Sequence, residues 1–344
     1  MSTERSFDTV GPVRLAVADL PEAGAGVRRV TFPQADGPGD VHSYLLRGAS
    51  GWTLVDAGLG APGAAAAWRE VVAALDAPLE RVVITHMHVD HVGGSAEVAP
   101  LCEGPVLQGR LDRGQALEAY AGGTWPGRQR DHALANGMPG DEAAAVETFW
   151  SGLAGMAHLA PTTPLDPGDR VDGWEVLLLP GHADGHLGLL RDGVLVSGDV
   201  LLDRVSPAIG VWPGCEPDPL ALYLDTLGRI AELAPRLALP GHGEPIADPA
   251  GRARTIAAHH RDRLDETAAA LGRDPRTAYE GSRVLWPADL DPGQRSFAIA
   301  EALAHLERLV REDRAARSGA GASGRARFSA PGPPRPARAA GPSR

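Results

Sequence analysis

The stretch "ITHMHVDHVGG", Ile84 to Gly94, places three of the chain's 12 histidines and one aspartate within six residues. It continues the apolar, β-branched run "RVVIT", which is typical of a buried strand. Alternation along an extended backbone puts His86 and His88 on the same side, and a turn near Asp90 can direct Asp90 and His91 to a second point. Imidazole and carboxylate are typical ligands of zinc and similar ions. The two nearby pairs therefore predict two nearby metal ions.

Each of these metal ions needs further ligands, and the rest of the chain supplies three in a similar setting. His182 follows "VLLLPG", Asp199 follows "VLVSG" and His242 follows "LALPG". Each lies where a strand is expected to end and a loop to begin, which is where open α/β sheets gather their sites. We therefore expect all seven side chains to form one metal centre.

Composition limits the classes of function. The 344 residues carry a formal net charge of −11, and an acidic body repels a phosphate backbone, which disfavours nucleic acid as a partner. No apolar run suggests a signal peptide or a membrane span, so we expect a cytoplasmic protein without a membrane partner. The two cysteines, Cys102 and Cys215, do not make a disulfide framework.

Strand-like runs alternate with helix-like runs over much of the chain, which favours an α/β layered domain. We divide the chain into a lead-in (1–26), this α/β domain (27–251), a helical unit (252–317) and a Gly/Pro/Arg-rich tail expected to be disordered (318–344). Within the domain, residues 109 to about 165 read as a helical insert. Such an insert is either a lid or substrate wall, or surface padding.

Five motifs occur in an order that resembles the metallo-β-lactamase superfamily: "LVDAG", "THMHVDHVGG", "LPGHADGH", "SGD" and "LPGHGEP". The resemblance spans roughly residues 27–250 and implies a four-layer αβ/βα sandwich of two sheets flanked by helices, with a dinuclear metal site at one edge. It also implies the following ligands: His86, His88 and His182 for the first metal, Asp90, His91 and His242 for the second, Asp199 as the bridge, and Asp56 orienting a ligand from outside the site.

Two divalent ions about 4 Å apart lower the pKa of a shared water, so that hydroxide exists at neutral pH. Zinc suits these ligands, and iron or manganese are alternatives. Asp90 and Asp199 are the candidate catalytic residues, because their carboxylates can accept hydrogen bonds from the hydroxide and orient it. The chemistry predicted is metal-assisted hydrolysis without a serine or cysteine nucleophile.

The C-terminal unit, with "HHRDRLDET" and "LWPADLDPGQRSFAIAEALAHLERLVRE", resembles the winged-helix extension of one branch of the superfamily. That branch includes β-lactamase-like endoribonucleases and thioesterase-like hydrolases of polyketide pathways. No two-stranded wing is expected after Arg317, which weakens the ribonuclease hypothesis. The commonest β-lactamases have cysteine in place of Asp199, and the basic glutathione-contacting region of glyoxalase II has no evident counterpart.

We therefore expect a dinuclear metal-dependent hydrolase of a small-molecule acyl substrate, namely an ester, thioester or lactone. The alternative is a metal-dependent phosphodiesterase or endoribonuclease, which arginines such as Arg110, Arg128 or Arg130 in the cleft would favour. A non-catalytic metal-binding module is a third hypothesis, and a homodimer is left open.

Two further features allow more than one interpretation. "GLGAPG", Gly58 to Gly63, matches the glycine pattern of a dinucleotide-binding turn, but Asp56 lies two residues before it and favours a tight strand-to-helix turn. His186 lies four residues after His182 and could support the metal site, contact substrate or be structural.

Overall fold

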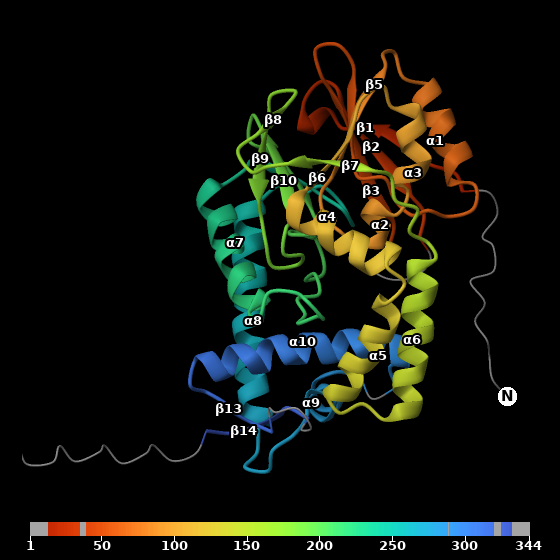
Figure 1. The fold of residues 1–344 in the computed structure, drawn as a ribbon. Coiled ribbons are helices and arrows are strands. Elements are labelled where there is room, and N and C mark those ends of the chain that lie inside the picture. Colours follow the sequence, from red (N-terminus) through yellow and green to blue (C-terminus); the bar gives the residue numbers. More distant parts are fainter. Residues whose placement is uncertain (1–12, 35–38, 288, 320–324, 332–344) are drawn as a thin grey trace, which may run out of the picture.

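Two β-sheets form the centre of the computed structural model, which describes residues 13–34, 39–287, 289–319 and 325–331 (Figure 1). The first sheet has seven strands in chain order: β1 (Ala16–Asp19), β2 (Val27–Phe32), β3 (Val41–Arg47), β4 (Trp52–Val55), β5 (Leu79–Ile84), β6 (Val106–Gly109) and β7 (Thr162–Leu165). Pairing is antiparallel from β1 to β4 and parallel from β4 to β7. Because β1 belongs to this sheet, part of the predicted lead-in of residues 1–26 lies in the α/β domain.

The second sheet has five strands in the order β12-β11-β10-β9-β8. Its strands are β8 (Arg170–Val171), β9 (Trp174–Leu178), β10 (Leu187–Arg191), β11 (Val194–Gly198) and β12 (Leu237–Pro240). β8 to β11 pair antiparallel and β11 pairs with β12 in parallel, through a connection that contains a helix. The strands β9, β11 and β12 each end shortly before a residue predicted to hold metal.

Helices cover the outer face of each sheet. Helices α1 (Ala64–Ala73) and α3 (Ser95–Val98) flank the first sheet, and α7 (Pro219–Leu233) and α8 (Pro249–Ala270) flank the second (Figure 1). Val83 packs between the sheets, whereas its neighbour Val82 packs outward with Trp68 of α1. Both are fully buried because both faces of the sheet are covered. The four-layer αβ/βα sandwich is thereby confirmed.

The segment between β6 and β7 is helical, as expected for the insert at 109–165. It contains α4 (Arg110–Ala116), a π-helical turn η3 (Leu117–Ala121), α5 (Trp125–Ala135) and α6 (Gly140–Ala154). The C-terminal unit adds α9 (Ala278–Leu285) and α10 (Pro292–Arg311), and α10 passes beside α5 and α6 (Figure 1). Met138 and Trp150 of the insert share one apolar core with Ile299 of α10. The remaining short elements are η1 (Pro21–Ala23), η2 (Ala99–Leu101) and α2 (Val89–Val92).

The chain after residue 317 differs from the prediction of a missing wing and a disordered tail. β13 (Ala316–Ser318) and β14 (Arg327–Ser329) form an antiparallel ribbon, and Phe328 is fully buried. The backbone N–H of Phe328 donates to the carbonyl of Arg276 at 2.7 Å, and the reverse bond measures 2.8 Å. Phe328 buries apolar surface against the helices, although the average composition of the segment predicted that too little apolar surface would be buried. The rest of the predicted tail, 320–324 and 332–344, lies outside the described residues.

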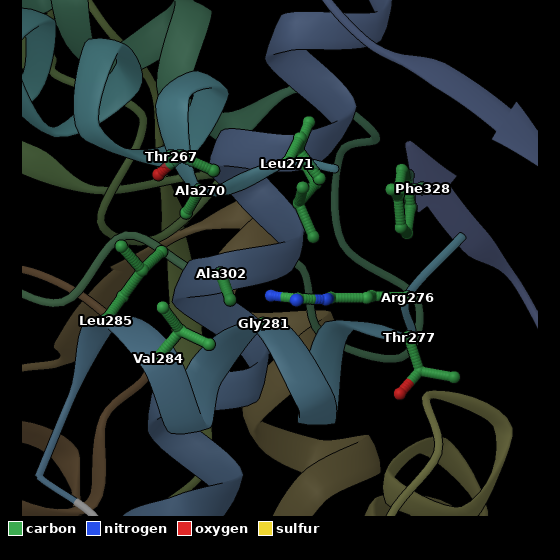
Figure 2. Close-up of a pocket in the computed structure, with 11 residues that line it drawn as sticks. Thr267, Ala270, Leu271, Arg276, Thr277, Gly281, Val284, Leu285, Ala302 and Phe328 are labelled. Atoms are coloured by element: carbon green, nitrogen blue, oxygen red, sulfur yellow. The ribbon is translucent and has the colours of Figure 1, made fainter. Parts of the chain in front are cut away.

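Helix α8 connects the sandwich to the C-terminal unit. The boundary predicted between residues 251 and 252 falls inside this helix, so the two parts share an element. Figure 2 shows the small gap among α8, α9, α10 and Phe328, where the Arg276 side chain extends toward Ala302. The gap holds about 20 Å³, which is room for about one water.

Among the described residues, no helix is both long and apolar enough to cross a membrane.

Candidate metal centre

The opening motif forms the turn between β5 and the short helix α2. His86 follows the end of β5, His88 immediately precedes α2, and Asp90 and His91 lie in its first turn. Gly93 and Gly94 follow this turn, and their lack of a side chain lets the turn pack closely against neighbouring backbone. A Cβ on Gly93 would lie 2.9 Å from the carbonyl oxygen of Met156, and one on Gly94 would overlap the backbone of Ala57.

The other three predicted ligands lie at the ends of second-sheet strands, facing this turn. His182 lies in the loop after β9, Asp199 directly follows β11, and His242 follows β12. Gly241 leaves the space between them open, because a Cβ there would overlap the Asp199 carboxylate and lie 2.6 Å from His91 Cε1. The centre therefore lies at the edge where the two sheets meet.

The structure brings all seven predicted side chains together. Ligand atoms lie within 4.8 Å of one another in three sets: His86, His88 and His182; His86, His91 and Asp199; and Asp90, His91 and His242. The first and last sets are the two predicted groups. Asp199 lies between them, with one carboxylate oxygen 3.4 Å from His91 Nε2 and the other 3.7 Å from His182 Nε2 and 3.5 Å from His242 Nε2.

Unpartnered buried atoms test whether these residues fit a cation. His91 Nε2, His182 Nε2, His242 Nε2 and Asp199 Oδ1 are buried without a hydrogen-bond partner. Such atoms are rare in folded proteins and costly, unless a water or an ion satisfies them. These four converge on one place, and imidazole nitrogen and carboxylate oxygen are zinc-type ligands. The residues therefore fit divalent metal ions.

The electrostatics of the centre also favour cations. Burial lowers the pKa of His88 to about 3, so its ring is neutral and keeps a free lone pair. Burial alone would raise the pKa of Asp199, but attraction to His91 and His242 outweighs burial and holds it well below its usual range. Burial likewise opposes protonation of His242, yet Asp199 and Asp90 raise its pKa to about 10. Metal ions would displace such protons, because a ligating imidazole must be neutral.

Hydrogen bonds from outside the centre orient the ligand rings. His91 Nδ1 donates to Asp56 Oδ2 at 2.8 Å, which leaves Nε2 directed into the centre. His182 Nδ1 donates to the carbonyl of Ala208 at 3.0 Å, and His242 Nδ1 donates to the carbonyl of Asp40 at 3.0 Å. Asp56 also accepts from both the backbone N–H and the hydroxyl of Thr85. The structure thus places Asp56 in the orienting position that the resemblance implies.

Two further residues support the metal centre, of which the sequence indicated only His186, as one of three interpretations. His186 Nε2 accepts from the backbone N–H of Asp199 at 3.2 Å, so of its three interpretations the structure favours support of the metal site. Asp112 accepts from the backbone N–H of Met87 at 2.9 Å and of Gly185 at 2.6 Å. Asp112 lies in α4, and nothing in its sequence spacing distinguishes it from a surface aspartate.

The glycines of the "GLGAPG" turn pack against the metal-binding turn, as expected for a tight strand-to-helix turn. Gly60 lies against the backbones of Met156 and Gly93, where a Cβ would approach both carbonyl oxygens to within 2.9 Å. The backbone N–H of Gly94 donates to the carbonyl of Gly58. The glycines therefore serve close packing against the metal-binding turn.

The metal centre opens into a cleft of about 2130 Å³ between the sandwich, the insert and α10. His88, Asp90, His182 and Asp199 line its inner end, and most of its other walls are apolar or aromatic. Among the described lining residues, the one basic side chain is Arg14. The acidic lining residues besides the metal ligands are Glu118, Asp184, Asp289, Asp291 and Glu301.

Comparisons with known proteins match both parts of the chain. The family described as "Metallo-beta-lactamase superfamily" matches residues 36–242. The family described as "Metallo-beta-lactamase-like, C-terminal domain" matches residues 264–331, which include the β13–β14 ribbon.

Individual relatives cover most of the chain. The probable metallo-hydrolase YqjP of Bacillus subtilis is 30% identical over 300 residues, which cover 83% of this chain and 92% of YqjP. A crystal structure of a metallo-beta-lactamase family protein from Thermus thermophilus has 33% identity and a TM-score of 0.74, covering 89% of this chain and 98% of that one. An atrochrysone carboxyl ACP thioesterase of Aspergillus fumigatus is 24% identical, covering 70% of this chain and 64% of the thioesterase.

Proposed function

The chain belongs to the metallo-β-lactamase superfamily and is a metallo-hydrolase of that family, and from this premise we propose that it hydrolyses an ester, thioester or lactone with two metal ions. His86, His88 and His182 would hold one ion, Asp90, His91 and His242 the other, and Asp199 would contact both. When bound, such ions supply an activated water and polarise the carbonyl under attack. Zinc fits the donor set, and iron or manganese fit the same atoms.

The protein's own groups would position the reactants. Asp90 and Asp199 lie at the inner end of the cleft, where their carboxylates can accept hydrogen bonds from the attacking water. A water held in this way directs a lone pair toward the acyl carbon rather than toward the protein. A substrate that fills the cleft would displace water from between its apolar walls, which would strengthen each of these hydrogen bonds.

The observation that carries the acyl substrate class is the charge of the cleft. The arginines that would have favoured a phosphodiester do not line it. Arg110 pairs with Asp166 at 2.8 Å, Arg130 pairs with Glu147 at 2.8 Å, and Arg128 pairs with Glu118. Apart from the metal ligands and the Arg128–Glu118 pair, the described lining of the cleft has one basic side chain, Arg14, and no cluster of cations that would hold a polyanion. This supports a neutral acyl group over RNA as the substrate.

The test combines metal analysis with a panel of substrates. We expect purified protein to hold about two ions per chain and to cleave a thioester or a lactone in a chelator-sensitive reaction. Single-stranded RNA, the substrate of the alternative hypothesis, should stay intact. Cleavage of RNA but of no acyl compound would reject the acyl assignment. Less than one ion per chain, with no activity restored by added metal, would reject the enzyme.

Asp199→Ala tests the contact with both metal sites. We expect loss of part of the bound metal and an activity lower by about 100-fold or more, since even residues that only orient ligands contribute 10- to 100-fold. Circular dichroism should show a folded protein. Asp225→Ala, an exposed aspartate on α7, is the matched control and should keep both properties. Full activity and unchanged metal content in Asp199→Ala would remove Asp199 from the site.

A further inference from the structure

Five aromatic rings from three separate segments form one cluster along the cleft. We name this cluster the aromatic chamber; it consists of Trp125 (α5) and Phe149 and Trp150 (α6), all from the insert, together with Trp212 (the loop between β11 and α7) and Phe297 (α10). Ring centroids lie 5.5 Å apart for Trp150–Trp212, 5.4 Å for Trp150–Phe297, 5.3 Å for Trp212–Phe297, 5.8 Å for Phe149–Trp150 and 6.5 Å for Trp125–Trp150. The chain is poor in aromatic residues, at 5%, yet three of its seven tryptophans meet here.

Trp125 and Trp150 belong to the apolar core shared by the insert and α10, but two other rings of the chamber are more open than the tryptophans of the sandwich. Trp52, Trp68 and Trp174 are almost fully buried. In contrast, Trp212 and Phe297 are only partly buried, and the surface that they leave open faces the cleft. Contiguous apolar surface that is left open in a concave site marks a place where an apolar ligand binds.

The loop that carries Trp212 connects the chamber to the metal centre. Ala208 in this loop accepts the hydrogen bond that orients His182, four residues before Trp212. The backbone N–H of Val211 donates to the carbonyl of Ala300 in α10 at 3.0 Å, which fixes the other end of the loop. Met87, between two ligand histidines, also packs against the apolar core that contains the chamber. This loop and Met87 therefore link the chamber to the metal centre along the cleft.

We infer that the aromatic chamber binds a ring-bearing, aromatic acyl group of the substrate while its carbonyl carbon lies at the metal centre. The inference rests on the proposed function and names its substrate class. Most ring pairs in the chamber meet edge to face, at interplanar angles between 72° and 89°. Such rings offer both edges and faces to a further aromatic ring. The thioether of Met87 adds a contact that favours aromatic over aliphatic groups.

A series of thioesters of N-acetylcysteamine tests the preference in the metal-loaded enzyme. Acetyl, cyclohexanecarbonyl, benzoyl and 2-naphthoyl thioesters share one leaving group and differ only in the acyl part. We expect KM to fall along this series, with benzoyl about 2- to 12-fold below cyclohexanecarbonyl, since ring pairs stabilise beyond their buried area. Equal KM values for the two six-membered rings would overturn the aromatic assignment.

Variants locate the preference in the chamber. Trp212→Ala should raise KM for the naphthoyl thioester about 10-fold or more, and by a larger factor than it raises KM for the acetyl thioester. Phe297→Leu keeps the side chain apolar and most of its volume, so it should fold normally while the ratio between the KM values for the benzoyl and cyclohexanecarbonyl thioesters approaches one. Trp286→Ala is the matched control, because Trp286 borders the cleft outside the chamber, beside Arg263. If Trp212→Ala and Trp286→Ala behave alike, the chamber is not the acyl site.

Calorimetric titration with 2-acetonaphthone separates this inference from the proposed function, because this neutral ketone binds without being hydrolysed. We expect Trp212→Ala to bind it about 10-fold or more weakly than wild type, with unchanged metal content. That loss, combined with no hydrolysis of any thioester or lactone, would support the chamber and reject the proposed reaction. Hydrolysis of thioesters with no difference in ketone affinity between the two proteins would support the reaction and reject the chamber.

Discussion

Asp112 joins the two loops that carry most of the first ligand set. One carboxylate oxygen accepts from Met87, between His86 and His88, and the other accepts from Gly185, in the loop of His182. A Cβ on Gly185 would lie 2.7 Å from that carboxylate, so glycine permits the contact. Burial raises the pKa of Asp112 to about 7, even though both hydrogen bonds favour the charged form.

Asp112→Asn should weaken metal binding. The NH2 end of the new amide is a donor, so it cannot accept a hydrogen bond from the backbone N–H that it faces. We expect metal affinity to fall about 10- to 100-fold and the free energy of unfolding to fall by about 1–3 kcal/mol for the unsatisfied N–H. Competition with a chelator measures the first quantity and urea denaturation the second.

Asp166→Asn is the matched control for Asp112→Asn. This exposed partner of Arg110 lies nearby, and a surface ion pair contributes only about 0–1 kcal/mol. The same metal affinity in both variants would show that Asp112 does not hold the ligand loops.

The metal ligands and Asp112 differ in how far the sequence predicts them. The metal ligands are histidines and aspartates clustered within a few residues at strand ends. Such clusters seldom serve a purpose other than metal binding. Asp112 makes its contacts through backbone N–H groups, which every non-proline residue carries. Its partners Met87 and Gly185 therefore leave no signal in the sequence, and only the fold brings them together.

At the scale of elements, β14 shows how composition can mislead. The segment around it is rich in Gly, Pro, Ala and Arg, and a three-residue strand is too short for alternation to show. Yet β14 pairs with β13 and also bonds to Arg276, which lies 52 residues earlier in the chain. The long helices α8 and α10 were predictable because their apolar positions repeat over many turns.

Phe328→Ala should destabilise the C-terminal unit. Phe328 is fully buried in the same apolar core as Trp150 and Leu306, and truncating a buried phenylalanine costs about 3–5 kcal/mol. Phe328→Leu keeps most of the apolar volume and should cost less than about 1.5 kcal/mol. Urea denaturation followed by tryptophan fluorescence measures both. Equal stability of wild type and Phe328→Ala would mean that the ribbon contributes nothing to folding.

At the scale of the whole molecule, the insert and the C-terminal unit depend on each other. Each presents an apolar face, and the two faces meet in one core that also borders the cleft. The apolar pattern of a helix predicts which face is buried but not which other helix covers it. The layered sandwich could therefore be predicted from motifs and alternation, whereas the wall that shapes the substrate cleft could not.

A buried pair of histidines lies where α8 crosses α10. His305 Nδ1 donates to the carbonyl of Glu301, so its Nε2 is the acceptor for His260 Nδ1 at 3.4 Å. His260 Nε2 in turn accepts from the hydroxyl of Ser206 at 3.1 Å, at the cleft wall. Both rings are fully buried, which disfavours their charged forms. Burial lowers the pKa of His305 to about 4, and burial together with His305, His259 and Arg263 lowers that of His260 to about 3.

Acid should therefore loosen this junction between the sandwich and the C-terminal unit. Between pH 6.5 and about 4 the unfolded chain binds a proton on His305 that the native state does not, so the free energy of unfolding falls as pH falls. The loss at pH 5 is about 2 kcal/mol for this side chain. His305→Gln keeps an acceptor for His260 but does not titrate, so its stability relative to wild type should rise by about that amount from pH 7.5 to pH 5. Urea denaturation of both proteins at each pH measures this difference. Both proteins carry the same metal ligands, so the protonation of those ligands cancels in the comparison. If the stabilities of the two proteins change in parallel with pH, His305 does not control the acid response.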